Sequence, residues 1–390
     1  MTPTRTTPSG TSADRSAMLG NATSGCMLVG WRRSPDPPPC PKELGQTAYV
    51  ERPVFSAIIQ SFKDPVQQAA QLTQRLRAIP IPKEIIVNDD AHGATSGAWL
   101  PLLKGPNEFY ISSPDLHEVR AYNRLAQMAR GELLVFVQGD CCLPRSSTWM
   151  LDAAGLFQQL PRLAMLSARA GFDEVLNWQL TSEYRDARTW GAAPYKALDH
   201  AVRVPRNGSA GSETVPFVFA PGVDNGPLLY RRNALLAIGG FDQSYSCAAG
   251  HLSGHYDFEA SLRFWVHGWQ VGVFYGGPVN GIGGRKTSRN PARKRERHSN
   301  ELWNGKRVEA LWRAHNATIT RRLAESRRDE PLVWLTPAQR LAMRDAAEAR
   351  LGKLSKQRCY EGVARPRVAG PKEPRRDGAA HSHSAVYSHG

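Results

Sequence analysis

Residues 133–140, with the sequence LLVFVQGD, form a continuous apolar run that ends in a glycine and an aspartate. Two similar runs precede it, VFSAII at 54–59 and EIIVNDD at 84–90. Continuous apolar runs of this length, without polar alternation, are typical of strands that are covered on both faces. The segments between them, 66–79 and 116–130, carry apolar residues at helical spacing. This alternation of strands and helices predicts an α/β fold with a mainly parallel sheet flanked by helices.

Acidic residues follow two of these strands directly. The second run ends in Asn-Asp-Asp at 88–90, and the third ends in Gln-Gly-Asp at 138–140. Ligands of such sheets bind outside the carboxyl ends of the strands. We therefore expect a functional site at this edge, with Asp89, Asp90 and Asp140 among its residues.

The pattern of short elements continues through the rest of the chain. Gly131, Gly239-Gly240 and Gly268 are predicted to end helices, because glycine favours the position after a helix. The expected helices lie at 147–160, 232–238 and 257–267, and the expected strands at 163–167, 215–219, 227–230 and 271–274. From residue 300 to about residue 354, a charged sequence rich in Ala, Arg and Glu predicts further helices.

Composition divides the chain into four parts. Residues 1–50 and 361–390 are rich in small, polar and helix-breaking residues, and they are predicted to be a disordered leader and a disordered tail. Residues 51–285 are predicted to form the α/β domain. Residues 286–360 are predicted to form a basic loop and a helical extension.

Positive charge is concentrated toward the C-terminus. The chain has 50 Lys+Arg and 35 Asp+Glu, which gives a net charge of +15. Residues 51–280 hold 20 basic and 21 acidic side chains, whereas residues 281–350 hold 17 and 8. Such a surplus suggests nucleic acid, an anionic membrane or a phosphate-bearing ligand. A basic nucleic-acid-binding protein is therefore our third interpretation, although the charge lacks the interleaved aromatic residues of a single-strand binding platform.

The sequence has no segment that resembles a transmembrane helix, which needs about 18 consecutive apolar residues. Its six cysteines are scattered, and its N-terminus lacks the charged-then-apolar pattern of a signal peptide. These features favour a cytoplasmic protein. Three glycosylation sequons, at Asn21, Asn207 and Asn316, leave a Golgi or secretory location open if an N-terminal anchor is missing from this chain.

Five segments of the chain, in order, resemble the motifs of family 2 glycosyltransferases, which have the GT-A fold. They are 55–62 (FSAIIQSF), 84–90 (EIIVNDD), 120–123 with 129–132 (RAYN and ARGE), 226–232 with 238–242 (GPLLYRR and IGGFD), and 256–263 (YDFEASLR). The resemblance covers about residues 53–285. It implies a Rossmann-like GT-A fold and an inverting glycosyltransferase of the hexosyltransferase type. Such an enzyme moves a sugar from a nucleotide-diphosphate donor to a hydroxyl of a carbohydrate or other acceptor.

The resemblance also implies roles for individual residues. Asp257 would be the general base that deprotonates the acceptor hydroxyl, with Glu259 as its neighbour. A divalent cation, Mg²⁺ or Mn²⁺, would neutralise the departing diphosphate and be held by Asp140. The residues implied to contact the donor are Ser61, Asp89, Asp90, Arg120 and Asn123. A second interpretation of Asp257 is an ordinary cap at a helix start, and one of Asp89 and Asp90 could serve only in a turn.

The third strand departs from the family pattern. The family usually has Asp-x-Asp after this strand, whereas this chain has Gln138-Gly139-Asp140, with a single carboxylate. One carboxylate and the substrate phosphates can still hold Mg²⁺, which keeps several of its waters. The missing acid motivates an alternative function, a catalytically impaired relative that binds a nucleotide or a carbohydrate.

The basic stretch 285–297 also has two interpretations. It could be a flexible loop that closes over the donor diphosphate, with Arg285, Lys286 or Arg289 supplementing a weak metal site. The second interpretation, which we favour for most of these residues, is a solvated run of charge or a patch for nucleic acid or membrane.

Overall fold

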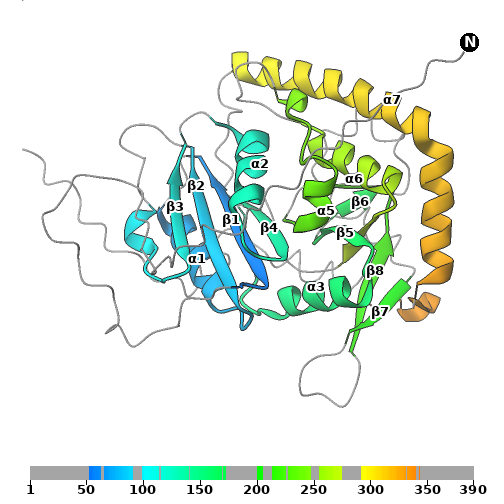
Figure 1. Ribbon diagram of the computed structural model, residues 1–390, viewed down its shortest axis with the longest axis horizontal. Helices are drawn as coiled ribbons and strands as arrows, with labels where there is room; N and C mark the ends of the chain where they lie inside the picture. The colour runs from blue at the N-terminus through cyan, green and yellow to red at the C-terminus, as the bar shows by residue number, and fades with distance from the viewer. Residues whose placement is uncertain are drawn as a thin grey trace, which may run out of the picture. The chain divides into compact units, whose positions relative to one another are not determined.

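The computed structural model describes the central part of the chain, drawn as coloured ribbon in Figure 1. The described residues are 52–62, 66–90, 99–113, 116–139, 141–168, 170–172, 200–204, 213–224, 227–246, 254–274, 291–330, 332–339 and 342. All of them belong to one compact unit, Tyr49–Gly390. The predicted leader at 1–50, the predicted tail at 361–390 and Asp140 lie outside the described residues.

Helices and strands alternate through the described residues. The helices are α1 (Val66–Arg77), α2 (Glu118–Met128), α3 (Thr148–Gln159), α5 (Arg232–Ala237), α6 (Tyr256–Val266) and α7 (Pro291–Asp329), with 3-10 turns η2 (Leu100–Leu102) and η5 (Gln243–Tyr245). The strands are β1 (Phe55–Ser61), β2 (Lys83–Asp89), β3 (Glu108–Ser112), β4 (Leu133–Gln138), β5 (Leu163–Ser167), β6 (Ala170–Phe172), β7 (His200–Val204), β8 (Glu213–Phe219), β9 (Gly222–Asp224), β10 (Leu228–Arg231), β11 (Gln270–Phe274) and β12 (Leu332–Trp334).

One large mixed sheet organises the structure. Its order is β12-β7-β8-β11-β5-β10-β4-β1-β2-β3, and β6 pairs separately with β9. The four strands β3, β2, β1 and β4 are adjacent and parallel to one another. Strands β5, β11 and β7 point the same way as these four, and β10, β8 and β12 run in the opposite direction. The predicted α/β class, with a sheet that is mostly parallel in direction and flanked by helices, is confirmed.

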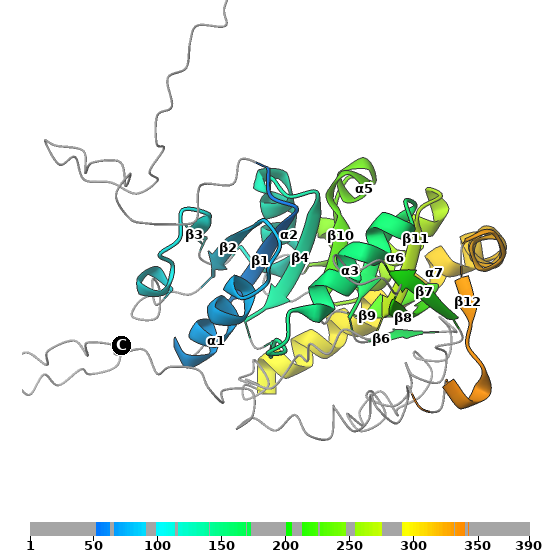
Figure 2. The ribbon, with the colours of Figure 1, turned by 90° about the horizontal axis from the view of Figure 1, so that it is seen from below.

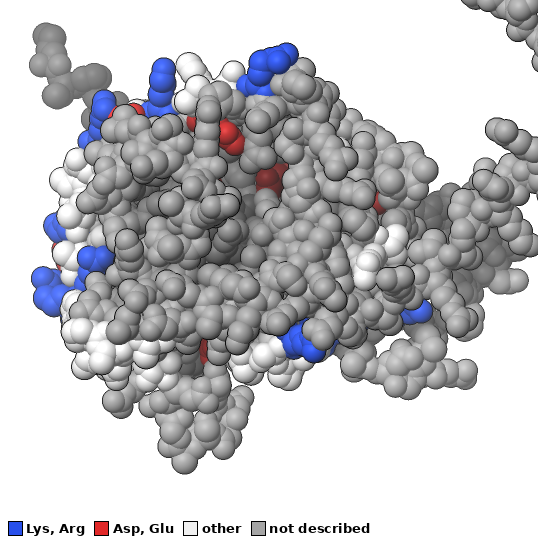
Figure 3. Space-filling view, turned by 180° about the vertical axis from the view of Figure 1, so that it is seen from behind, with Lys and Arg blue, Asp and Glu red and all other residues white. Residues whose placement is uncertain are grey.

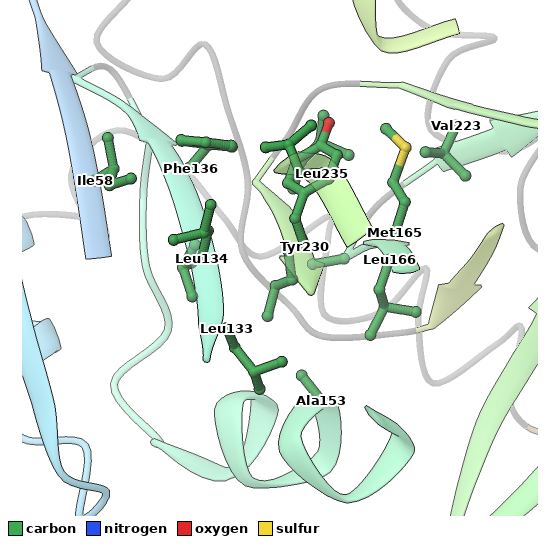
Figure 4. Packing of buried hydrophobic residues seen from close by; sticks show 14 of the residues in the cluster. Ile58, Leu133, Leu134, Phe136, Ala153, Met165, Leu166, Val223, Tyr230 and Leu235 are labelled. Atoms are coloured by element: carbon green, nitrogen blue, oxygen red, sulfur yellow. The ribbon is translucent and has the colours of Figure 1, made fainter. Parts of the chain in front are cut away.

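Helices cover both faces of the sheet, as the views in Figures 1 and 2 show. Phe136 on β4 packs against Tyr122 of α2, with ring centroids 4.4 Å apart. The neighbouring Leu133 points instead toward Ala153 of α3 (Figure 4). Helices α2 and α3 therefore cover opposite faces of β4, so both faces of this strand are apolar. This double cover explains the continuous apolar run at residues 133–137.

Aromatic side chains join the parallel and the mixed halves of the sheet. Phe136 lies 5.3 Å from Tyr230 on β10 and 5.7 Å from Phe241, measured between ring centroids. Phe241 in turn meets Tyr256 at the start of α6, at 5.4 Å. All four rings are buried. The aromatic contacts thus connect β4, β10 and α6. These three elements come from distant parts of the sequence and carry or adjoin site residues.

The structure corrects the role that we predicted for Gly131. Helix α2 ends at Met128 with Ala129 as its C-cap, in an extended conformation, so Gly131 does not cap it. A Cβ atom at Gly131 would lie 2.5 Å from the backbone nitrogen of Ser56 on β1. The glycine is required because two backbone segments approach closely there. The predictions for Gly239, Gly240 and Gly268 agree with the structure, since all three have positive φ after a helix.

The basic C-terminal part is helical earlier than predicted. Helix α7 begins at Pro291, so residues 291–297 of the basic stretch form its first turns, and residues 285–290 lie outside the described residues. Proline suits the first turn of a helix, where its missing N–H group is not needed. Beyond α7, strand β12 pairs with β7 of the main sheet, where we had expected continued helix.

Helix α7 is bound to the rest of the unit by polar side chains. Arg322 donates a hydrogen bond to the carbonyl of Val266 (2.6 Å), at the C-terminal end of α6. The buried side chain of Asn304 donates to the carbonyls of Tyr245 (2.8 Å) and Gly254 (3.0 Å). Arg322 thus places a cation at the C-terminal end of α6, where the helix dipole favours positive charge. None of the helices among the described residues is long and apolar enough to cross a membrane.

Candidate active site

The carboxyl ends of β1, β2 and β4 lie side by side. In the parallel register, Ser61 pairs with Asp89, and Gln60 pairs with Gln138. Asp90 follows directly after β2, and its backbone N–H donates to the carbonyl of Ser61 (2.9 Å). The acids at the end of β2 therefore lie at the edge where we expected a site. Asp140, which follows Gln138 by two residues, lies outside the described residues.

Asp89 and Asp90 are both buried but have different surroundings. The Tyr110 hydroxyl of β3 donates to Asp89 Oδ2 at 2.8 Å. Asp90 accepts from the backbone N–H groups of Leu116 (2.8 Å) and His117 (3.1 Å). Asp90 thus holds the turn into α2, where His117 has a positive φ of 64°. Of the two acids, Asp90 is the one bonded to backbone N–H groups of this turn, and donor contact by either acid stays a prediction.

Ser61 is held by a residue that the sequence did not single out. The indole Nε1 of buried Trp99 donates to Ser61 Oγ at 2.8 Å. Beside it, Gln60 accepts from Asn88 Nδ2 (2.8 Å) and donates to Asp90 Oδ2 (3.4 Å). The strand ends are therefore cross-linked by side-chain hydrogen bonds, which fix their relative positions.

Asn123 and Arg120 lie one turn apart on α2. Asn123 donates to the carbonyl of Phe241 and accepts from its N–H, both at 2.8 Å. A Cβ atom at Gly240 would lie 2.6 Å from Asn123 Oδ1. The Asn123 amide thus fastens α2 to the turn after α5. Arg120 is half-buried, and within the described part of the chain its guanidinium has no hydrogen bond or ion pair.

Asp257 and Glu259 lie in the first turn of α6, after His255, whose φ is 64°. Both are buried, at 5% and 4% exposure. Asp257 Oδ1 accepts from the N–H of Phe258 at 3.0 Å. Asp257 thus lies at the N-terminal end of a helix, where the helix dipole favours negative charge.

Glu259 has a different environment. Its carboxylate forms a two-point ion pair with Arg263, one turn later on α6. Arg263 also donates to the carbonyls of Ile238 and Gly240, both at 2.6 Å. Burial raises the pKa of Glu259, and Arg263 opposes that rise. Arg263 thus bridges α6 and the turn after α5, and Glu259 holds Arg263 in place.

Glu118, at the start of α2, is a site residue that the sequence reasoning missed. Its Oε1 atom accepts from Gln138 Nε2 of β4 at 2.8 Å and from the Tyr256 hydroxyl of α6 at 3.0 Å. The hydroxyl of Tyr122, one turn later on α2, also approaches this oxygen, at 3.2 Å. Tyr256 precedes Asp257, so these bonds connect the predicted base to the strand edge. The sequence signal that could have identified Glu118 is its position as an acidic residue in the first turn of a helix.

The described residues do not by themselves form a metal centre. They include no group of three or more His, Cys, Asp and Glu side chains that could hold an ion. A divalent cation here would depend on Asp140 together with oxygens of the substrate, as Mg²⁺ sites commonly do. Of the two neighbouring cysteines, Cys141 is buried and does not form a disulfide, whereas Cys142 is disulfide-bonded.

Charge is unevenly spread over one face of the molecule. In Figure 3, the coloured Lys and Arg side chains lie mainly along the margin, and the coloured Asp and Glu side chains lie mostly nearer the middle. Several of the basic residues of α7 are occupied by contacts within the unit. Arg307, for example, lies 4.0 Å from the centre of the Tyr245 ring and donates to Asp242 (3.2 Å). Because these basic side chains are bonded within the protein, their charge is less available for contacts with nucleic acid.

Comparison with known proteins gives only distant likenesses. No family model and no curated protein matches the chain. Among solved structures, TarS of S. aureus is 15% identical with a TM-score of 0.37, over 56% of this chain and 34% of TarS. The mannosyltransferase PcManGT from Pyrobaculum calidifontis, in complex with GDP-Man and Mn²⁺, is 15% identical with a TM-score of 0.39, over 79% of this chain and 85% of that one. TarS 1–349 in complex with UDP-GlcNAc has a TM-score of 0.34 at 15% identity, over 56% of this chain and 55% of that one. The chain thus spans about a third of the length of TarS, and scores at this level carry no argument about function.

Proposed function

We propose that this protein is an inverting glycosyltransferase of family 2 type that uses a nucleotide-diphosphate sugar. The observation that supports this most is a continuous set of contacts at one sheet edge. Gln60, beside Asp90, pairs in register with Gln138, which donates to Glu118, which accepts from Tyr256. Through these contacts, the acids after β2 and the buried Asp257 belong to the same edge. Acidic groups from separate segments are what binding a donor and activating an acceptor require.

In the proposed reaction, Asp257 takes the proton of the acceptor hydroxyl. The acceptor oxygen then bonds to the anomeric carbon of the sugar as the bond from that carbon to the diphosphate breaks. The nucleoside diphosphate leaves with the bonding electrons. Direct displacement by one attacking oxygen inverts the anomeric configuration. The position of Asp257 in the first turn of α6 favours the carboxylate form that a general base needs.

The donor would lie along the ends of β1 and β2. Asp89, whose carboxylate accepts from the Tyr110 hydroxyl, would accept hydrogen bonds from the base or ribose. Arg120 supplies a positive group for the diphosphate, a contact that guanidinium forms well. Ser61 would contact the donor beside Trp99. Asn123 would contribute by holding the wall of the pocket, because its amide is engaged by Phe241.

A specific observation favours a second candidate function. Gln138 stands near the position where the family pattern has an acid, and its amide is bonded to Glu118. A chain that lacks this acid could bind a nucleotide or carbohydrate without turnover. Measuring the release of UDP or GDP from nucleotide sugars, with Mg²⁺ or Mn²⁺, separates the two candidates. The proposed enzyme releases the nucleoside diphosphate above a no-protein control, whereas the binding protein shows saturable binding with no release.

A further inference from the structure

Glu118 is the point where three site-forming segments meet. Its Oε1 atom accepts hydrogen bonds from Gln138 at the end of β4 (2.8 Å) and from Tyr256 at the start of α6 (3.0 Å). Its own backbone follows His117, whose N–H donates to Asp90 (3.1 Å). One carboxylate therefore connects the donor side, the segment that precedes Asp140 and the segment that precedes Asp257.

The Tyr256 hydroxyl is suited to remain a hydrogen-bond donor to Glu118. Burial, followed by the charge of Glu118, raises the pKa of Tyr256 well above its usual value. The hydroxyl therefore stays protonated across the physiological pH range. A hydrogen bond to an ionised acceptor is about twice as strong as one between neutral groups. The Glu118–Tyr256 bond is thus a strong link between α2 and α6.

The start of α6 has a backbone geometry that this link can stabilise. His255 has a φ of 64°, in the left-handed region that a residue with a side chain seldom adopts. The first hydrogen bond of α6 runs from the N–H of Glu259 to the carbonyl of His255 (3.0 Å). Tyr256 and Asp257 lie between these two residues. Anchoring Tyr256 therefore fixes the turn that directs Asp257.

We propose that Glu118 is a positioning residue that holds Asp257 in its reactive orientation through Tyr256. This inference rests on the proposed glycosyltransferase function. Glu118 acts through another residue, so removing the link should lower kcat and leave donor binding unchanged. Displacing a reacting group by about 1 Å can reduce a rate by about 100-fold.

Two tyrosines provide a matched pair of variants. Tyr256→Phe and Tyr122→Phe each remove one hydroxyl that donates to Glu118 Oε1, and each leaves its ring in place. Of these two hydroxyl groups, that of Tyr256 connects α6 to α2, whereas that of Tyr122 stays within α2. We expect Tyr256→Phe to lower kcat about 10- to 100-fold with the dissociation constant of the nucleoside diphosphate unchanged. Tyr122→Phe should keep both values within about twofold, because Tyr122 and Glu118 lie on the same helix. Equal loss of kcat in both variants would overturn the proposal.

Hydrogen exchange tests the positioning without depending on activity. The amide of Glu259 should exchange faster in Glu118→Ala and Tyr256→Phe than in the unmodified full chain, and at the unmodified rate in Tyr122→Phe. If that amide exchanges at the same rate in all variants, Glu118 does not position α6, and the inference is wrong. If the exchange rates change as expected but the unmodified protein releases no nucleoside diphosphate, the proposed function fails while the link between Glu118 and α6 stands.

Discussion

The two ends of the parallel strands use acidic residues in opposite ways. At the amino end, Glu84 is buried and paired with Arg130 (2.8 Å), and Glu108 is paired with Arg77 (2.6 Å). At the carboxyl end, Asp89, Asp90 and Glu118 accept from a tyrosine hydroxyl, backbone N–H groups and a side-chain amide. Arginine cancels a carboxylate charge, whereas neutral donors orient a carboxylate without adding positive charge.

Packing differs between the two ends as well. At the amino end, Ser56 donates to Glu84 (2.6 Å) and accepts from the N–H of Gly131 (2.8 Å), where a Cβ atom would meet the Ser56 backbone. Glu84 and Ser56 are therefore both engaged within the fold there, and no space remains for a side chain at position 131. We interpret the amino end as the part that stabilises the sheet and the carboxyl end as the proposed site. The predictions below are ordered by the expected size of their effects.

The largest effect is expected for Asp257→Asn. The amide keeps the size of the carboxylate and can still accept from the N–H of Phe258, but it cannot take a proton at neutral pH. Loss of a general base reduces rates by about 10²- to 10⁴-fold. Steady-state assays of nucleoside-diphosphate release should show this loss, with donor binding unchanged. Undiminished activity in this variant would remove Asp257 from the role of base.

The next effect is a loss of stability at the amino end. Glu84→Gln leaves Arg130 without its charge partner and should lower the free energy of unfolding by about 2–3 kcal/mol, because breaking a buried ion pair is costly. Urea titration measures this change. Glu132→Gln is the control, since Glu132 pairs with Arg231 but its side chain is 69% exposed, and it should cost less than about 1 kcal/mol. A fall in kcat for Glu84→Gln would contradict the separation of the two ends.

A smaller effect is expected at the donor-binding face of α2. Arg120→Gln should weaken binding of a nucleoside diphosphate about 10-fold, because it removes one guanidinium contact to phosphate, worth about 1.4 kcal/mol. The exposed Arg124, on the same helix, provides the charge-matched control Arg124→Gln, which should bind normally. Titration calorimetry at fixed salt measures both. Equal weakening in the two variants would indicate only a general effect of charge.

The smallest effect depends on pH. Burial raises the pKa of Glu108, but hydrogen bonds from Arg77, Gly105 and Lys104 outweigh it and hold the pKa below its usual value. A depressed pKa adds stability above the pKa of the unfolded state, and this stability is lost as the pH falls through the folded value. Glu108→Gln should therefore cost about 0.5–1 kcal/mol at pH 7, since Arg77 is partly exposed. The difference between the two proteins should vanish in urea titrations at acidic pH, and a constant difference would contradict the account.

Sequence patterns predicted the buried elements best. Strands β1, β2, β4 and β5 follow from continuous apolar runs, since almost every residue in them is buried. Strand β3 was missed because it lies at the sheet edge, where its residues Glu108–Ser112 are partly exposed and give no apolar run. The start of α7 was missed because a dense run of basic residues resembles a solvated loop.

The candidate site was predictable in place but not in detail. Asp89 and Asp90 were found because they end a strand, and their edge of the sheet follows from parallel pairing. Glu118 was missed because its partner Tyr256 lies 138 residues away, a separation that no local pattern reveals. Trp99 was missed for the same reason, since its partner Ser61 lies 38 residues earlier.

The most direct test of the central claim compares nucleotide binding at the two ends of the strands. Thermal unfolding would be measured for the unmodified chain, Asp89→Asn and Glu84→Gln, with UDP, GDP and their sugars in the presence of Mn²⁺. A ligand at about 100 times its dissociation constant stabilises the native state by about 2.7 kcal/mol. The account predicts this stabilisation in the unmodified chain and in Glu84→Gln, and a clear reduction in Asp89→Asn. Stabilisation by none of these ligands, or equal stabilisation of all three proteins, would contradict it.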